Sequence, residues 1–173
     1  MVYQSSNSYH KFIHNIFNAI VILTMALLFF VSCTIEKKSL IIYNNIDEKS
    51  SKESVSVSYP IDENDHFSIE FIHSVNKSPV VEYYKIDKKG NLYVYKTIYY
   101  NYGAGVPTDI EGDETISYGE DGSMIIDNIN RKIDNLTYYL SDISDHVLKI
   151  NDSDPISLWG IFGQNETIHI DIR

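Results

Sequence analysis

A histidine and a carboxylate, His73 and Glu82, occur in two neighbouring segments that both have the alternating pattern of β-strands. If Lys77 and Ser78 are the central residues of a two-residue hairpin, the antiparallel register places His73 directly opposite Glu82. Directly opposed side chains have Cβ atoms about 4.5–5.5 Å apart, which is close enough for an imidazole and a carboxylate to bond. Such a pair can hold a ligand or exchange a proton with it.

A second hairpin adds a cation to this row. Residues 87–91 read Asp-Lys-Lys-Gly-Asn, with the glycine where a hairpin needs a positive φ, and a pairing of Ile86 with Leu92 places Lys96 opposite Glu82. A carboxylate on an apolar face is costly unless it is paired, and this register pairs it on both sides. A loop of another geometry before the second strand would instead shift the register by one residue and turn Glu82 outward.

A glycine-rich bend is expected at the same end of the fold. The third strand runs back toward the first hairpin and leads into Gly103, Ala104 and Gly105, with Pro107 after them. Glycines let backbone N–H groups approach a ligand closely, and the proline fixes the exit of the chain. We therefore predict that these residues and the row of three side chains form a ligand- or partner-binding site.

Each of these features also has a structural interpretation. A histidine–carboxylate pair on an apolar face is often a buried pair that fixes strand register, and the bend could equally be a tight corner between two sheets. Catalysis by Ser74 with His73 is disfavoured, because neighbouring residues of a strand point to opposite faces. The acidic residues 109–114 lack the calcium-loop pattern, and the other histidines lack zinc-ligand spacing. We therefore expect no catalytic residue, metal ion or cofactor.

The residues that must position this site alternate with a period of two, for example at Phe67, Ile69 and Phe71. Turn residues recur about every ten positions, which is typical of an all-β sandwich or barrel. We therefore predict an antiparallel β-sandwich of about eight to ten strands over residues 55–173. The isoleucine spacing in residues 125–133 would also fit one short helix.

The charge and cysteine content exclude several classes of protein. The 173 residues carry 14 basic and 24 acidic side chains, a formal net charge of −10. Phosphate groups would repel so acidic a chain, and nucleic-acid binding is therefore excluded. The single cysteine excludes a disulfide scaffold, and 14 tyrosines with 7 phenylalanines argue against a disordered chain.

Residues 1–33 are predicted to be a signal peptide or membrane anchor. Residues 16–31 carry no charged side chain, and the composition turns polar directly after Cys33. A small residue followed by cysteine at the end of an apolar run resembles the bacterial lipoprotein box, in which the cysteine is lipidated. Phe30 departs from that box, where an aliphatic residue is usual. An uncleaved anchoring helix that begins near Phe12, and a cytosolic protein without an anchor, are the two alternatives.

Residues 34–54 mix lysines, acidic residues and serines, which predicts a polar tether before a β domain of residues 55–173. Within the tether, only residues 40–43 have the composition of a strand. Both anchored alternatives place the β domain on the extracytoplasmic face of the cell membrane.

Three short motifs together resemble one family. Residues 71–75 read Phe-Ile-His-Ser-Val, residues 79–82 read Pro-Val-Val-Glu, and residues 103–107 read Gly-Ala-Gly-Val-Pro. This combination resembles the domain of unknown function 1850. The resemblance implies small bacterial and archaeal proteins with an N-terminal apolar segment, whose genes often lie beside those of TAXI-type TRAP transporters. Those transporters use a secreted substrate-binding protein and commonly carry organic anions.

We therefore expect a membrane-tethered extracytoplasmic accessory or binding module that is associated with a TAXI-type TRAP transporter for organic anions and catalyses no reaction. The alternative is a small extracytoplasmic hydrolase, either metal-dependent or assisted by His73 and Glu82. The two differ in the expected effect of Glu82→Gln. In an accessory module the substitution would lower stability or partner binding, whereas in an enzyme the fold would survive and a reaction would disappear.

Overall fold

The structure is a computed structural model that forms two compact units. It describes residues 5–31, 38–44, 54–101, 106–107 and 109–173. The first unit, residues 1–36, contains the helix α1 (Ser5–Val31), and the second unit is residues 37–173. No helix within the described ranges is both long and apolar enough to cross a lipid bilayer. Cys33 lies outside the described residues, so its lipidation stays a prediction.

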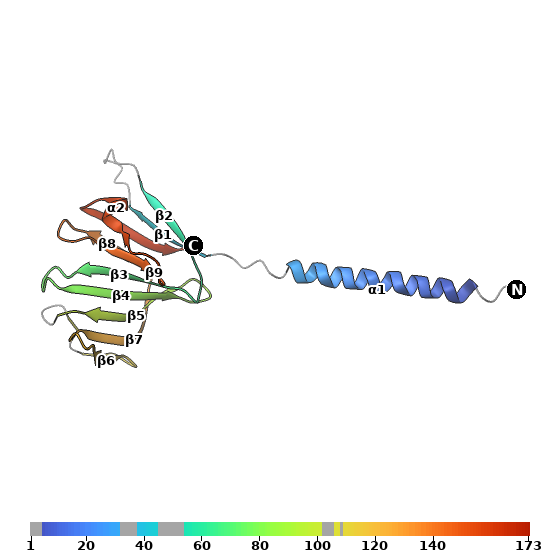
Figure 1. The fold of residues 1–173 in the computed structure, drawn as a ribbon, viewed down its shortest axis with the longest axis horizontal. Coiled ribbons are helices and arrows are strands. Elements are labelled where there is room, and N and C mark those ends of the chain that lie inside the picture. The colour runs from blue at the N-terminus through green and yellow to red at the C-terminus, as the bar shows by residue number, and fades with distance from the viewer. Residues whose placement is uncertain (1–4, 32–37, 45–53, 102–105, 108) are drawn as a thin grey trace. The chain divides into compact units, whose positions relative to one another are not determined.

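The second unit contains two antiparallel sheets, and Figure 1 shows the strands β3, β4, β5, β7 and β6 side by side in the larger one. The smaller sheet has the order β2-β1-β11-β8, and the larger has the order β10-β9-β3-β4-β5-β7-β6. The strands are β1 (Lys38–Asn44), β2 (Ser56–Ile61), β3 (His66–Ile72), β4 (Pro79–Ile86), β5 (Leu92–Tyr99), β6 (Thr115–Tyr118), β7 (Met124–Ile133), β8 (Leu136–Leu140), β9 (Val147–Ile150), β10 (Ile156–Ser157) and β11 (Glu166–Ile172). The predicted all-β, sandwich-like fold is confirmed, with eleven strands among the described residues.

The core consists of apolar side chains from both sheets. Phe67 and Ile69 of the larger sheet and Leu40 and Ile168 of the smaller sheet have no solvent-exposed surface. The ring of Phe67 stacks on that of Tyr84, with 5.0 Å between the ring centroids. Each such side chain contributes about 1.5–3 kcal/mol by leaving water, so the period-two pattern of the sequence is what drives the two sheets together.

The β domain begins earlier than residue 55, the boundary that we expected. β1 lies within the segment assigned to the tether, yet it is an inner strand of the smaller sheet, paired with β2 on one side and β11 on the other. Leu40 and Ile42 are completely buried. The sequence does not show that β1 belongs to the β domain, because its apolar residues are few and its flanks are polar. Its partner β11 is also distant in the sequence.

Residues 125–133 belong to β7, so the helical alternative for this segment is wrong. A short helix occurs instead at α2 (Leu158–Phe162), where the Ser157 hydroxyl accepts a hydrogen bond from the Gly160 backbone N–H over 2.9 Å. The chain leaves α2 through Gly163, whose φ of 84° is readily adopted by glycine.

Candidate functional site

Two adjoining cavities open on the face of the larger sheet that carries Glu82. The larger, which we call the Glu82 cavity, has a volume of about 470 Å³, and its lining includes Phe71, His73, Glu82, Tyr99, Tyr139 and His146. The smaller, which we call the loop cavity, has a volume of about 220 Å³ and lies beside Pro107, Asp109, Glu111 and Glu114. The cavities adjoin because Glu82 and Tyr99 line both of them.

Two tyrosines hold the carboxylate of Glu82. Tyr84, two residues along β4, donates its hydroxyl hydrogen bond to Oε2 over 2.9 Å, and Tyr138 of the opposite sheet donates to the same oxygen. The two hydroxyl oxygens are 2.7 Å apart. Because both phenols bond Oε2, neither of them occupies Oε1. The core thus fixes the carboxylate and leaves its second oxygen to other partners.

Both tyrosines act as donors to this carboxylate. Burial raises the pKa of Tyr84, and the negative charge of Glu82 raises it further. Burial likewise raises the pKa of Tyr138 well above its ordinary value, and the nearby Tyr84 and Glu82 raise it further. The phenols therefore keep their protons at neutral pH, and the three side chains form a hydrogen-bonded bridge between the two sheets.

His73 lines the same cavity as Glu82 but does not lie opposite it, so the predicted cross-strand pair is wrong. β3 and β4 pair Ile69 with Glu82 and Ile72 with Pro79. The partner of Glu82 on β3 is therefore Ile69, four residues before the predicted partner His73. Because a shift of four residues is even, the side chain of Glu82 still lies on the predicted face of the sheet. The carboxylate of Glu82 thus points toward the core as predicted, but His73 is not its cross-strand partner.

The turn between β3 and β4 explains the shift. Its ends are closed by hydrogen bonds from the His73 backbone N–H to the Ser78 carbonyl, 2.9 Å, and from the Lys77 N–H to the His73 carbonyl, 3.0 Å. Lys77 adopts a φ of 54°, which is uncommon for a residue other than glycine. Pro79 cannot donate a ladder hydrogen bond, and the chain forms a wider turn instead of the two-residue hairpin.

The imidazole of His73 is held by the turn that follows β3. Its Nδ1 accepts hydrogen bonds from the backbone N–H groups of Val75, 3.3 Å, and Asn76, 3.5 Å. In the neutral ring this assigns the proton to Nε2. Nδ1 is thus engaged by the backbone and is not free to take a proton from a ligand.

Lys96 points away from the site, so its predicted pairing with Glu82 is wrong. Ile86 does pair with Leu92, as expected, but β5 carries an extra residue, Tyr95, after which Glu82 faces Thr97. Lys96 instead faces Tyr83 on the other side of the sheet, with its Nζ 5.2 Å from the centroid of the Tyr83 ring. A one-residue bulge of this kind moves every later side chain of the strand to the opposite face.

His146 is a site residue that no pattern in the sequence marks. It is only 7% exposed, its ring stacks on Phe71 with 5.3 Å between centroids, and no described group bonds its Nδ1. The segment is fixed by α2, since the Leu158 N–H donates to the His146 carbonyl and the Trp159 N–H donates to the Asp145 carboxylate, both over 2.9 Å. Burial lowers the pKa of His146, so its ring is neutral at neutral pH.

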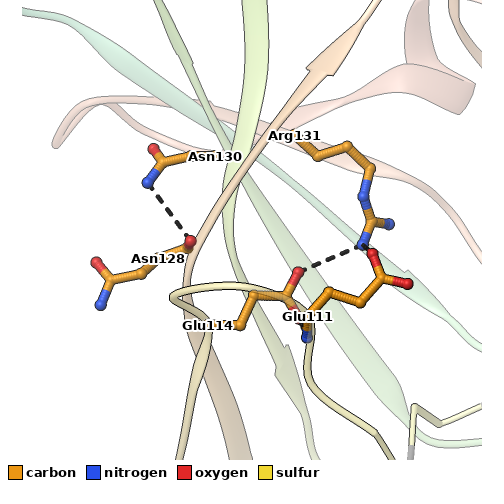
Figure 2. A network of polar contacts seen from close by, with 5 residues as sticks. All are labelled: Glu111, Glu114, Asn128, Asn130 and Arg131. Carbon is orange, nitrogen blue, oxygen red and sulfur yellow. Dashed lines mark hydrogen bonds and ion pairs between the residues drawn. The ribbon is translucent and has the colours of Figure 1, made fainter.

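An arginine on β7 holds the chain that borders the loop cavity. Figure 2 shows Arg131 reaching Glu114, 3.3 Å away, and Glu111, 3.7 Å away. Asn128 and Asn130 have φ values of 62° and 46°, which asparagine tolerates, and they lie where β7 passes the bulge of β5. The irregular stretch of β7 thus places Arg131 beside the acidic residues of the loop.

The glycine bend is only partly described. Pro107 lines the loop cavity, which shares Glu82 with the separate cavity that His73 lines. Gly103, Ala104 and Gly105 lie outside the described residues, and their part in the site stays a prediction.

One signal in the sequence could have identified the tyrosine bridge. Leu136, Tyr138 and Leu140 alternate on β8, and both leucines are buried, which puts Tyr138 on the inward face. A phenol on an inward face needs a hydrogen-bond partner, and a carboxylate on the facing sheet is the natural one. For His146, in contrast, no periodic pattern surrounds the residue, because it lies in the connection before β9.

The arrangement can bind a small molecule through directed hydrogen bonds. It combines one carboxylate oxygen, one imidazole N–H and aromatic walls in a concave space, which is the usual composition of a ligand site. Within the described residues, no three histidine, cysteine, aspartate or glutamate side chains are grouped as metal ligands.

Comparison with known proteins identifies the family. The family model described as "Domain of unknown function (DUF1850)" matches residues 67–155, which include nearly all of β3, the strands β4, β5 and β7, and the His146 segment. No curated protein and no solved structure matches the chain. The matched residues span more than half of the chain and contain His73, Glu82, Tyr138 and His146. The protein therefore belongs to the DUF1850 family.

Proposed function

We propose that this protein is a membrane-tethered, extracytoplasmic accessory protein of a TAXI-type TRAP transporter for organic anions, and that it binds a ligand without catalysing a reaction. The observation that supports binding most directly is the Glu82 cavity, where a carboxylate held by Tyr84 and Tyr138 faces a concave space. The apolar segment before Cys33 supports the anchor. Membership of the family supports the link to the transporter.

The state of His73 favours binding over catalysis. A histidine that acts as a general base needs a free ring nitrogen facing the substrate and an acceptor that orients its N–H. In this structure the backbone N–H groups of residues 75 and 76 bond Nδ1, so the N–H of Nε2 is what the ring can present. The carboxylate of Glu82 is likewise fixed by two phenols. Both groups are set to hold a ligand in one orientation.

Co-purification from native membranes tests the proposal. The full chain, tagged at its C-terminus and extracted with a mild non-ionic detergent, should enrich the binding protein or the permease of a TAXI-type transporter. A tagged, unrelated lipoprotein of the same host is the control for non-specific capture. If neither transporter component is enriched over that control, the accessory role is contradicted.

A small hydrolase is the second candidate, because His73, His146 and Glu82 line one cavity. The substitution Glu82→Gln separates the two functions. In the hydrolase, the variant would fold normally and lose turnover of an ester or amide substrate by orders of magnitude. In the accessory protein there is no turnover to lose, and only ligand or partner binding would weaken.

A further inference from the structure

We infer that the Glu82 cavity binds a small organic cation, an ammonium group on an apolar body. The inference rests on the proposed binding role and names the chemical class of the ligand. It also implies that the ligand of this cavity differs from the anionic cargo of the proposed transporter. Charge, the open carboxylate oxygen, the walls of the cavity and a buried histidine each support it.

The charge around the two adjoining cavities is negative. Four carboxylates line them, on Glu82, Asp109, Glu111 and Glu114, against one guanidinium, on Arg131. Arg131 is already engaged by two of the four. In a molecule of net charge −10, this excess raises the local concentration of cations and repels anions. An organic anion would have to be desolvated beside Glu82, which is unfavourable.

The open oxygen of Glu82 supplies the acceptor that an ammonium group needs. Tyr84 and Tyr138 both bond Oε2, and neither bonds Oε1. Because the phenols hold the carboxylate in place, little side-chain entropy is lost when a ligand binds it. A hydrogen bond between an ammonium and a carboxylate is also about twice as strong as one between neutral groups.

The walls of the cavity suit the rest of such a ligand. The aromatic rings of Phe71 and Tyr99 line it, and Val80 adds an apolar surface. Aromatic faces attract a cation held within about 6 Å of them and also accept its apolar body. Burial raises the pKa of Tyr99, and the charge of Glu82 raises it further, so this ring is neutral.

His146 gives an independent indication that the site is built for a ligand. The side chain is 7% exposed and lines the cavity, while its Nδ1 is buried without a partner among the described residues. A buried polar atom without a partner is unfavourable, and such an atom in a native fold calls for an explanation such as a bound ligand or water. Because the ring is neutral, it does not repel an ammonium group.

Three probes of matched shape and different charge test the inference. Benzylamine, benzoate and benzyl alcohol are titrated by isothermal calorimetry into the full chain, in a mild non-ionic detergent at neutral pH. We expect benzylamine to bind at least about tenfold more tightly than either of the others, the factor that a modest charge-assisted contact provides. If benzoate or benzyl alcohol binds as tightly as benzylamine, or if none of the three binds, the inference is overturned.

Two variants locate the binding. Glu82→Gln removes the charge with little change of shape and should weaken benzylamine binding about tenfold, to the level of benzyl alcohol. Glu120→Gln makes the same chemical change on an exposed turn and should leave it unchanged. Circular dichroism checks that both variants fold. If Glu82→Gln does not fold, Tyr99→Leu takes its place and should weaken benzylamine binding severalfold.

The outcomes separate this inference from the proposed function. Unchanged benzylamine binding in the folded Glu82→Gln variant contradicts the inference. The co-purification experiment would still test the proposed transporter role, because its result does not depend on the charge of the ligand.

Discussion

The hydroxyl of Tyr138 joins the carboxylate of Glu82 to the opposite sheet. In Tyr138→Phe the aromatic ring remains and this hydrogen bond is lost, together with the contact to the hydroxyl of Tyr84. We expect the free energy of unfolding to fall by about 1–2 kcal/mol, the usual cost of such a bond. Urea denaturation of the full chain, followed by far-UV circular dichroism, measures it.

The neighbouring residue of β8 provides a matched control. Tyr139 is 57% exposed, and its hydroxyl donates to Asn165 at the surface over 3.1 Å. Tyr139→Phe should therefore change the free energy of unfolding by less than about 0.5 kcal/mol. Equal losses in the two variants would show that the bridge to Glu82 does not stabilise the fold.

His146 makes stability depend on pH in a defined window. Burial lowers its pKa from the ordinary value of 6.5, while the charge of Asp145 opposes this shift. As the pH falls, the unfolded chain therefore takes up the proton first. The contribution of His146 is fully present above pH 6.5 and is lost as the pH falls from 6.5 toward the lower pKa of the folded state.

The variant His146→Phe tests this dependence. Its ring can still stack on Phe71 and Tyr138, the two side chains that contact the imidazole. We expect the wild-type chain to lose more stability than the variant between about pH 7 and pH 5, as measured by urea unfolding at each pH. Parallel pH profiles for the two proteins would contradict the account.

At the scale of elements, the hairpin between β4 and β5 has its turn where the sequence predicted it. The Asp87 carboxylate accepts hydrogen bonds from the backbone N–H groups of Lys89, 2.8 Å, and Asn91, 2.9 Å. Gly90 has a φ of 84°, as the sequence led us to expect. The pairing of Ile86 with Leu92 follows from this turn.

Gly90→Ala tests the turn. An added Cβ would lie 3.4 Å from Cε of Lys38 and 3.5 Å from Cγ2 of Ile172, which are ordinary contacts, so the cost comes from the positive φ. We expect a loss of about 1–2 kcal/mol in the free energy of unfolding. Lys89→Ala, on the exposed neighbour, should change it little. A Gly90→Ala variant as stable as the wild type would mean that the turn can adopt another conformation.

The sequence predicted most of the strands, the inward faces of β3 and β4, and the glycine turn, because each depends on residues close to one another in the chain. It did not predict the face of β5 after its bulge. It did not predict the pairing of Glu82. The wide turn before Pro79 depends on the left-handed conformation of Lys77, and nothing in the residue types around Tyr95 marks the bulge. Glu82 stayed on the inner face only because the shift between β3 and β4 is an even number of residues.

The sequence could not predict the side chains around Glu82 for a second reason. Tyr138 and His146 are more than fifty residues away from Glu82 in the sequence, and the two come together with it only when the sheets pack. A pattern of alternating residues shows which face a side chain occupies, but it does not show which side chain of another sheet it meets.

At the scale of the whole molecule, an acidic β domain follows an N-terminal helix as a separate compact unit. In the proposed function the cavity beside Glu82 is where the domain meets its ligand, and we propose that its rim also faces the transporter components. Tyr139 is exposed and lines the cavity, so a photoreactive side chain at this position would crosslink to a protein that contacts the rim.

Photo-crosslinking from the rim of the Glu82 cavity tests whether the domain contacts a transporter component there. A photoreactive amino acid replaces Tyr139 in the full chain, in its native host, and a second chain carries it in place of Tyr118, which is 66% exposed on β6 and outside both cavities. After irradiation, mass spectrometry identifies the adducts. We expect a transporter binding protein or permease to be crosslinked from position 139 and much less from position 118. Crosslinking of no transporter component from position 139, or equal crosslinking from both positions, would contradict it.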